Sequence, residues 1–104
     1  MRLKDKVAIV TGGAAGIGRA TATRFAKEGA SVIIADRDIE AAEAVVKELS
    51  AASGRAEAAR VDVSSKEDVE TMVAGVIASH QRIDVLINNA GITRDGFEIG
   101  RAHV

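Results

Sequence analysis

The stretch Thr11-Gly12-Gly13-Ala14-Ala15-Gly16-Ile17-Gly18 decides how the rest of the chain is interpreted. An apolar run at residues 6–11 precedes it, and a helical pattern follows it. Glycines between a strand and a helix let the backbone turn tightly and approach a phosphate, while the N–H groups that begin the helix attract the anion. We interpret the stretch as a pyrophosphate-binding turn. Its Gly-x-x-x-Gly-x-Gly spacing differs from the common dinucleotide fingerprint, so an ordinary strand–helix turn stays an alternative here.

The composition sets limits on the class of protein. A chain of 104 residues with a net charge of −1 is one small domain, and it has no basic block for binding nucleic acid. It contains no Cys, only two Phe and two distant His, so we expect no disulfide, no stacking platform for bases and no metal site. We see no signal peptide and no run long enough to span a membrane, and we expect a soluble, cytoplasmic protein without a membrane partner.

Four short apolar runs alternate with three helical patterns. The expected strands lie at residues 6–11, 31–35, 56–61 and 84–87. Strands joined by helices of this length pair in parallel through right-handed crossovers. The sequence therefore predicts an α/β fold, part of a Rossmann-type doubly wound parallel sheet, with the order βαβαβαβ and the strand order 3-2-1-4.

The helices carry recognisable ends and apolar faces. Gly29 is expected to end the first helix at 16–27, Asp38 to cap the second, and Ser64 with Glu67 to form a capping box on the third. Helical spacing predicts that the inner faces consist of Ile17, Ala20, Phe25 and Ala26 in the first helix, Ala42, Val45, Val46 and Leu49 in the second, and Val69, Met72, Val73, Val76 and Ile77 in the third.

Acidic residues end two of the predicted strands, where ligands of open parallel sheets bind. Asp36 lies 18 residues after Gly18, and a carboxylate there can accept both hydroxyls of an adenosine ribose while repelling a 2′-phosphate. Arg37 follows and can pair with such a phosphate instead. Asp62 can accept from an adenine amino group, with Val63 against the ring. A solvated Asp36–Arg37 pair and a helix-capping Asp62 are the plainer alternatives.

The fourth strand ends in Asn88-Asn89-Ala90-Gly91. Asn side chains can bridge neighbouring strand ends, and the small Ala-Gly pair lets a ligand pass close to the chain. Taken alone, the tetrapeptide is also typical of a turn.

Together these motifs resemble the short-chain dehydrogenase/reductase family over residues 1 to about 96, most closely the 3-oxoacyl-carrier-protein reductase branch. The resemblance implies binding of a nicotinamide dinucleotide, NAD rather than NADP. It also implies hydride transfer to or from a carbonyl or alcohol substrate, for example a 3-oxoacyl thioester. It also implies a homo-oligomeric full-length protein. The cofactor contacts that it implies come from Thr11, Gly12, Ala14, Ala15, Gly16, Ile17, Gly18, Asp36, Arg37, Asp62, Val63, Asn89, Ala90 and Gly91.

The chain departs from the family where the chemistry would begin. The family's catalytic Ser and Tyr-x-x-x-Lys motif have no counterpart, since the chain contains no Tyr, and no catalytic residue is assigned within 1–104. We expect an NAD(P)-binding half-domain at residues 1–97, truncated and inactive alone. Residues 98–104 do not resemble the family, and we interpret them as a sequencing or cloning scar.

Two other classes of protein remain alternatives. The first alternative is a stand-alone nucleotide-binding module. The second is a fragment of a Rossmann methyltransferase that holds S-adenosylmethionine. The methyltransferase class lacks the glycine spacing and the Asn-Asn-Ala-Gly strand end that are found here.

Overall fold

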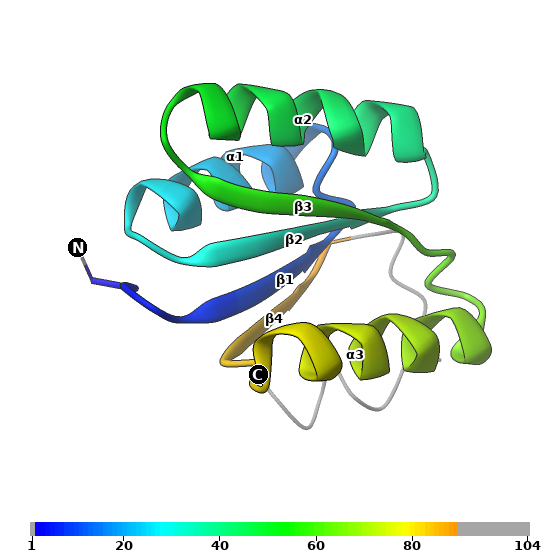
Figure 1. Cartoon of the computed structure of the whole chain (residues 1–104). Coiled ribbons are helices and arrows are strands. Elements are labelled where there is room, and N and C mark those ends of the chain that lie inside the picture. Colours follow the sequence, from blue (N-terminus) through cyan, green and yellow to red (C-terminus); the bar gives the residue numbers. More distant parts are fainter. Residues whose placement is uncertain (1, 90–104) are drawn as a thin grey trace.

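Strands and helices alternate along the computed structural model, which describes residues 2–89 (Figure 1). The strands form one parallel sheet in the order β3-β2-β1-β4, which confirms the predicted topology. β3 and β4 are each displaced by one residue from their predicted positions. The elements are β1 (Val7–Thr11), α1 (Gly16–Lys27), β2 (Ser31–Asp36), α2 (Ile39–Ala51), β3 (Arg55–Arg60), α3 (Lys66–His80) and β4 (Val85–Asn88).

The sheet separates two apolar cores. All five residues of β1 are buried, because the strand lies between β2 and β4 and helices cover both of its faces. Side chains alternate between faces: Ile9 and Ile33 pack with α3 residues, whereas Val10 and Ile34 pack with residues of α1 and α2. The carboxyl ends of four strands are thereby held side by side on a rigid support.

The inner face of α1 differs from the predicted one. Ile17 is 78% exposed and Ala20 is also exposed, while Gly18, Ala22 and Ala26 are buried. The buried residues recur every fourth position and are all small, so the helix lies close to the sheet along a narrow stripe. The prediction of an inner face is thus wrong for Ile17 and Ala20, whereas Ala26 is buried and Phe25 packs partly against the core as predicted.

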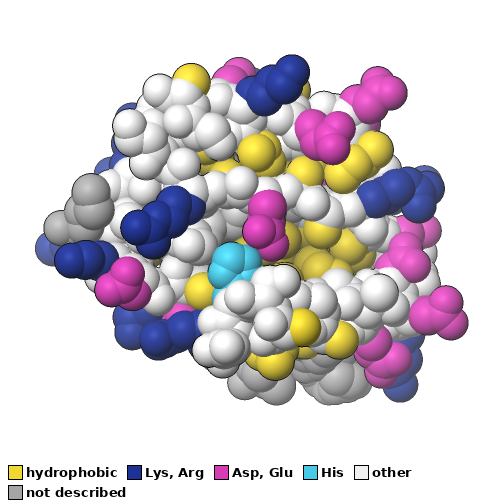
Figure 2. Space-filling model, viewed as in Figure 1, with side chains coloured by type: hydrophobic (Ala, Val, Ile, Leu, Met, Phe, Trp, Pro, Cys, Tyr) yellow, Lys and Arg dark blue, Asp and Glu magenta, His cyan; other side chains and the backbone are white. Residues whose placement is uncertain are grey.

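The other two helices follow the predicted stripes with one exception. Ala42, Val45 and Leu49 of α2 are buried, as are Val69, Met72 and Val76 of α3, while Val46 and Val73 are partly buried. Ile77 of α3 remains 44% exposed, so its predicted place on the inner face is wrong. Apolar side chains also reach the surface between β3 and α3, with charged side chains around them (Figure 2).

Local capping signals set the ends of two helices as predicted. The Asp38 carboxylate accepts from Ala41 N at 3.1 Å at the start of α2. α1 ends at Lys27, and Gly29 follows with a φ of 97°, a conformation that side chains with a Cβ rarely adopt.

The predicted capping box of α3 is wrong by one residue. Ser65, not Ser64, is the N-cap, and its hydroxyl accepts from Asp68 N at 3.1 Å. Ser64 instead donates both its N–H and its hydroxyl to the Asp62 carboxylate, at 2.9 and 2.6 Å. A nearby carboxylate thus competes successfully for the hydroxyl that the local pattern assigned to the helix.

Asp84 joins the start of β1 to the start of β4. Its Oδ2 accepts from Val7 N at 2.8 Å, and its N–H donates to the Val7 carbonyl at 2.8 Å. The Arg82 guanidinium donates to both carboxylate oxygens, at 2.8 and 2.7 Å. The hydrogen bonds from Arg82 are the main reason that the pKa of Asp84 lies below its usual value of 3.8, and the bond from Val7 lowers it further.

We predict that Asp84→Ala lowers the free energy of unfolding by about 1–3 kcal/mol, because Val7 N loses its acceptor beside the sheet. The pKa is lowered on folding, so this contribution is present above 3.8 and is lost as the pH falls through the lower folded-state pKa. Denaturant titrations at a series of pH values measure it. Glu43→Ala, which removes an exposed carboxylate of α2, is the control. An equal loss for Asp84→Ala at all pH values would contradict the prediction.

Candidate functional site

The loop between β1 and α1 depends on glycine at two positions with positive φ. Gly12 has a φ of 65° and Gly16 a φ of 58°. Gly12 N donates to the Ala35 carbonyl at 2.8 Å, so the first residue of the loop is still hydrogen-bonded to β2. A Cβ at Gly16 would meet nothing within 4 Å, which leaves its outer side open to a ligand. The structure thus confirms a turn between β1 and α1 that depends on glycine, and its binding of a pyrophosphate stays a prediction.

The start of α1 lies against this loop in a way that excludes side chains. A Cβ on Gly18 would lie 2.1 Å from the Gly12 carbonyl oxygen. Gly13, absent from the predicted set, is also enclosed: a Cβ there would lie 3.0 Å from both Val10 O and Ile34 Cγ2. The adjacent pair Gly12-Gly13 was the signal in the sequence for this position. The approach of Gly18 to Gly12 allows α1 to begin close to the loop, and the small size of Gly13 allows the loop to lie against β1 and β2.

The N-terminus of α1 is the helix start that lacks a side-chain cap among the described residues. Ala15 occupies the N-cap position without a side-chain hydrogen bond, and the first turn has no acidic residue. α2 and α3 are capped by Asp38 and Ser65. Uncapped N–H groups and the positive end of the helix dipole suit an anion such as a phosphate.

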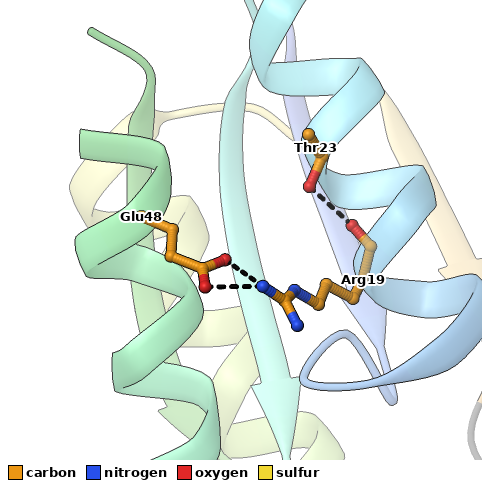
Figure 3. Close-up of polar contacts among 3 residues, drawn as sticks. All are labelled: Arg19, Thr23 and Glu48. Atoms are coloured by element: carbon orange, nitrogen blue, oxygen red, sulfur yellow. Dashed lines mark hydrogen bonds and ion pairs between the residues drawn. The ribbon is translucent and has the colours of Figure 1, made fainter. Parts of the chain in front are cut away.

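Arg19 lies next to this N-terminus, but its guanidinium is paired with Glu48 of α2 (Figure 3). Thr23 Oγ1 donates to the Arg19 carbonyl at 2.9 Å. Both members of the ion pair are about half exposed, so the pair contributes little to stability. The ion pair instead fixes the position of the Arg19 guanidinium, which is directed toward Glu48 of α2. An anion at the helix start would therefore be held mainly by backbone N–H groups.

Asp36 ends β2 and is connected to the glycine loop. Its Oδ2 accepts from Ala14 N at 3.2 Å, and its Oδ1 accepts from Asp38 N at 3.0 Å. The carboxylate remains partly exposed. The residue predicted to bind a ribose thus lies beside the residues predicted to bind the pyrophosphate, and it also helps to hold that loop.

Asp62 follows β3, next to the end of β2. Val61 N donates to the Asp36 carbonyl at 3.0 Å, which brings the two strand ends together. The two bonds from Ser64, its hydroxyl first, lower the pKa of Asp62 below 3.8, and the positive charges of Arg37 and Arg60 act in the same direction. The side chain is therefore an ionised acceptor at neutral pH.

Thr11 and the end of β4 form the third part of the site. The Thr11 hydroxyl is fully buried and lies 3.2 Å from the Ile87 carbonyl and 2.9 Å from Asn88 Oδ1. It also accepts from Asn89 N at 3.0 Å. Asn88, which was not in the predicted contact set, thus bridges the two strand ends. Thr11 acts between strands, with its hydroxyl turned toward β4.

The remaining residues of the predicted contact set differ in their exposure. Ala15 and Ile17 are exposed beside the loop, Arg37 is exposed after β2, and Val63 packs partly against the α3-side core. Ala90 and Gly91 lie outside the described residues. Within residues 2–89, no group of three or more His, Asp or Glu side chains is arranged to hold a metal ion. No helix in that range is long and apolar enough to cross a membrane.

The sequence profile of the family described as short chain dehydrogenase matches residues 6–100. The chain belongs to this family. The 3-oxoacyl-acyl-carrier-protein reductase of Thermotoga maritima is 44% identical to the chain over 95 residues, which cover 91% of the chain and 39% of that reductase. The chain thus spans about two fifths of the length of this curated relative.

Two further short-chain dehydrogenases extend the comparison. The short-chain dehydrogenase/reductase homolog YusS of Bacillus subtilis is 41% identical over 95 residues, which cover 90% of the chain and 87% of YusS. The crystal structure of a metagenomic short-chain oxidoreductase in complex with NADP matches with a TM-score of 0.85 and 42% identity. The match covers 88% of the chain and 42% of that structure.

These relationships confirm the predicted resemblance and the Rossmann-type fold. They favour a segment of a short-chain dehydrogenase over the methyltransferase alternative and over a stand-alone binding module, because the profile and all three relatives belong to short-chain dehydrogenases.

We predict that Gly18→Ala destabilises the chain by about 1–3 kcal/mol, because the new methyl group overlaps the Gly12 carbonyl. Gly75→Ala is a matched control: Gly75 also lies in a helix, and a Cβ there meets nothing within 4 Å. It should stabilise by about 0.5–1 kcal/mol. Denaturant unfolding of both variants tests the pair.

We also predict that Gly18→Val abolishes dinucleotide binding. Normal binding by this variant would show that the loop is not the phosphate site.

Proposed function

We propose that the chain is the dinucleotide-binding segment of a short-chain dehydrogenase, with NAD favoured over NADP. The observation that carries the proposal is the uncapped start of α1, open beside Gly16 and next to the carboxylate of Asp36. Backbone N–H groups at the helix start suit a pyrophosphate, and Asp36 suits the hydroxyls of the adjoining ribose. A bound nicotinamide cofactor supplies or accepts the hydride.

The chain's own residues bind and orient in this proposal. Gly18 keeps α1 close enough to the loop for its N–H groups to reach the phosphates, and Asp36 holds the loop through Ala14 N while facing the ribose. Asp62 accepts from the adenine amino group. Thr11, with Asn88, fixes the end of β4. Ala90 and Gly91 follow this strand in the sequence and are proposed to lie near the nicotinamide ribose.

The activity proposed for the full-length protein is hydride transfer between the dinucleotide and a carbonyl or alcohol substrate. A 3-oxoacyl thioester is the substrate class suggested by the name of the Thermotoga relative. Proton transfer to the carbonyl oxygen requires a positioned acid, and the chain contains no Tyr. We therefore propose that this acid lies on a segment of the full-length protein outside residues 1–97. We also propose a homo-oligomeric full-length protein, as the family resemblance implies.

The genomic reading frame past codon 97 tests the proposed activity. We expect the frame to continue and to encode a Ser and a Tyr-x-x-x-Lys motif. The protein so encoded should bind NAD by calorimetry and oxidise or reduce it with an alcohol or ketone panel. A stop codon directly after Val104 in the genome would contradict the proposal of a longer enzyme, and an encoded protein that binds neither NAD nor NADP would contradict the binding site.

The choice between the two dinucleotides is tested at Asp36. Asp36→Ala should shift the relative affinity toward NADP by about 1–3 kcal/mol, because a charge-assisted hydrogen bond to the ribose and a repulsion of the 2′-phosphate are both removed. Affinity for both dinucleotides should also fall, since Ala14 N loses its acceptor. Calorimetric titrations give the ratio, and Asp38→Ala serves as the control for losing a neighbouring carboxylate. An unchanged ratio in Asp36→Ala would exclude Asp36 as the selecting residue.

A further inference from the structure

The turn between β3 and α3 holds Asp62 through several hydrogen bonds of its own. Asp62 Oδ1 accepts from the N–H and the hydroxyl of Ser64, and the Asp62 carbonyl accepts from Ser65 N at 2.9 Å. Asp62 Oδ2 makes no hydrogen bond to any other described residue. One carboxylate oxygen is thus fixed within the turn and the other is left for a ligand.

Asp68, in the first turn of α3, completes this arrangement. Its Oδ2 accepts from Asp62 N at 3.1 Å, while its own N–H donates to Ser65 Oγ at 3.1 Å. In a standard capping box, the acid would bond to the N–H of the N-cap residue, here Ser65. Asp68 instead reaches three residues further back, to Asp62, the second residue after the end of β3. Its bond therefore fixes the strand end and not only the helix.

We propose that Asp68 is a positioning residue that directs Asp62 Oδ2 toward the amino group of adenine and so sets the discrimination between adenine and hypoxanthine. This inference rests on the dinucleotide site proposed above. An ionised carboxylate only accepts hydrogen bonds, so it favours the amino group of adenine and disfavours the carbonyl oxygen that hypoxanthine carries at the same position. The difference is sensitive to direction, because hydrogen bonds weaken steeply when misaligned.

The chain offers a matched control for the general effect of an acid at a helix start. Glu67 is also in the first turn of α3 and is exposed. Removing either carboxylate costs the same favourable interaction with the helix dipole. Only Asp68 is bonded to Asp62 N among these two. Asp68→Asn keeps an oxygen acceptor at the same distance from the backbone, so it should preserve the bond without the charge.

The experiment uses the full-length protein and compares its dissociation constants for NAD and for the analogue with hypoxanthine in place of adenine. The unsubstituted protein should bind NAD about tenfold or more tightly than it binds the hypoxanthine analogue, as a charge-assisted hydrogen bond implies. In Asp68→Ala this ratio should fall to about one to three, mainly through weaker NAD binding. Asp68→Asn and Glu67→Ala should retain the ratio. A purely structural role for Asp68 would weaken both dinucleotides equally and leave the ratio unchanged.

Each failure has a distinct meaning. A protein that binds neither dinucleotide overturns the proposed function. A protein that binds both equally shows that Asp62 does not select the amino group, and an unchanged ratio in Asp68→Ala shows that Asp68 acts only on the helix. Both of these outcomes overturn the inference and leave the proposed function standing. If Asp68→Ala does not fold, Asp68→Ser gives the same test, because its hydroxyl ends one bond short of the carboxylate oxygens.

Discussion

The contact between Gly18 and the Gly12 carbonyl is the constraint on which the site depends. A Cβ at residue 18 would lie 2.1 Å from that oxygen, so the close approach exists only without a side chain. It brings the uncapped start of α1 onto the glycine loop and continues into the small-residue stripe of Ala22 and Ala26. The position of the helix dipole relative to the strand ends is therefore set by the missing side chain at Gly18 and the small side chains of Ala22 and Ala26.

Carboxylates at the strand ends organise the loops around them before any ligand is considered. Asp36 accepts from the backbone of the glycine loop, and Asp62 accepts from Ser64 in the turn before α3. Each thus keeps its own loop in place while remaining partly exposed. Substituting such a residue changes the ligand contact and the loop together, so ratios between related ligands are more informative than single affinities.

The parts of the fold that follow from local rules could be predicted from the sequence, and the parts that arise from tertiary competition could not. The strand order follows from parallel crossovers, and Asp38 caps α2 because no neighbour competes for its carboxylate. Ser64 failed as a cap because Asp62 takes its hydroxyl. Ile17 failed as a core residue because α1 packs through small residues. The bond from Asp62 N to the Asp68 carboxylate is a contact that spacing alone does not encode.

The bonds between the ends of β1 and β4 also govern the order in which the chain can assemble. The Thr11 hydroxyl meets acceptors and a donor 76 to 78 residues away, and Val7 meets Asp84 at a separation of 77. Contacts this distant in sequence form late, because a long loop must close before they are made. On the ribosome, β1 to β3 are synthesised well before β4. The central strand therefore keeps one open edge until β4 at Val85–Asn88 has been synthesised, and during this interval chaperones that shield exposed strand edges have an opportunity to act.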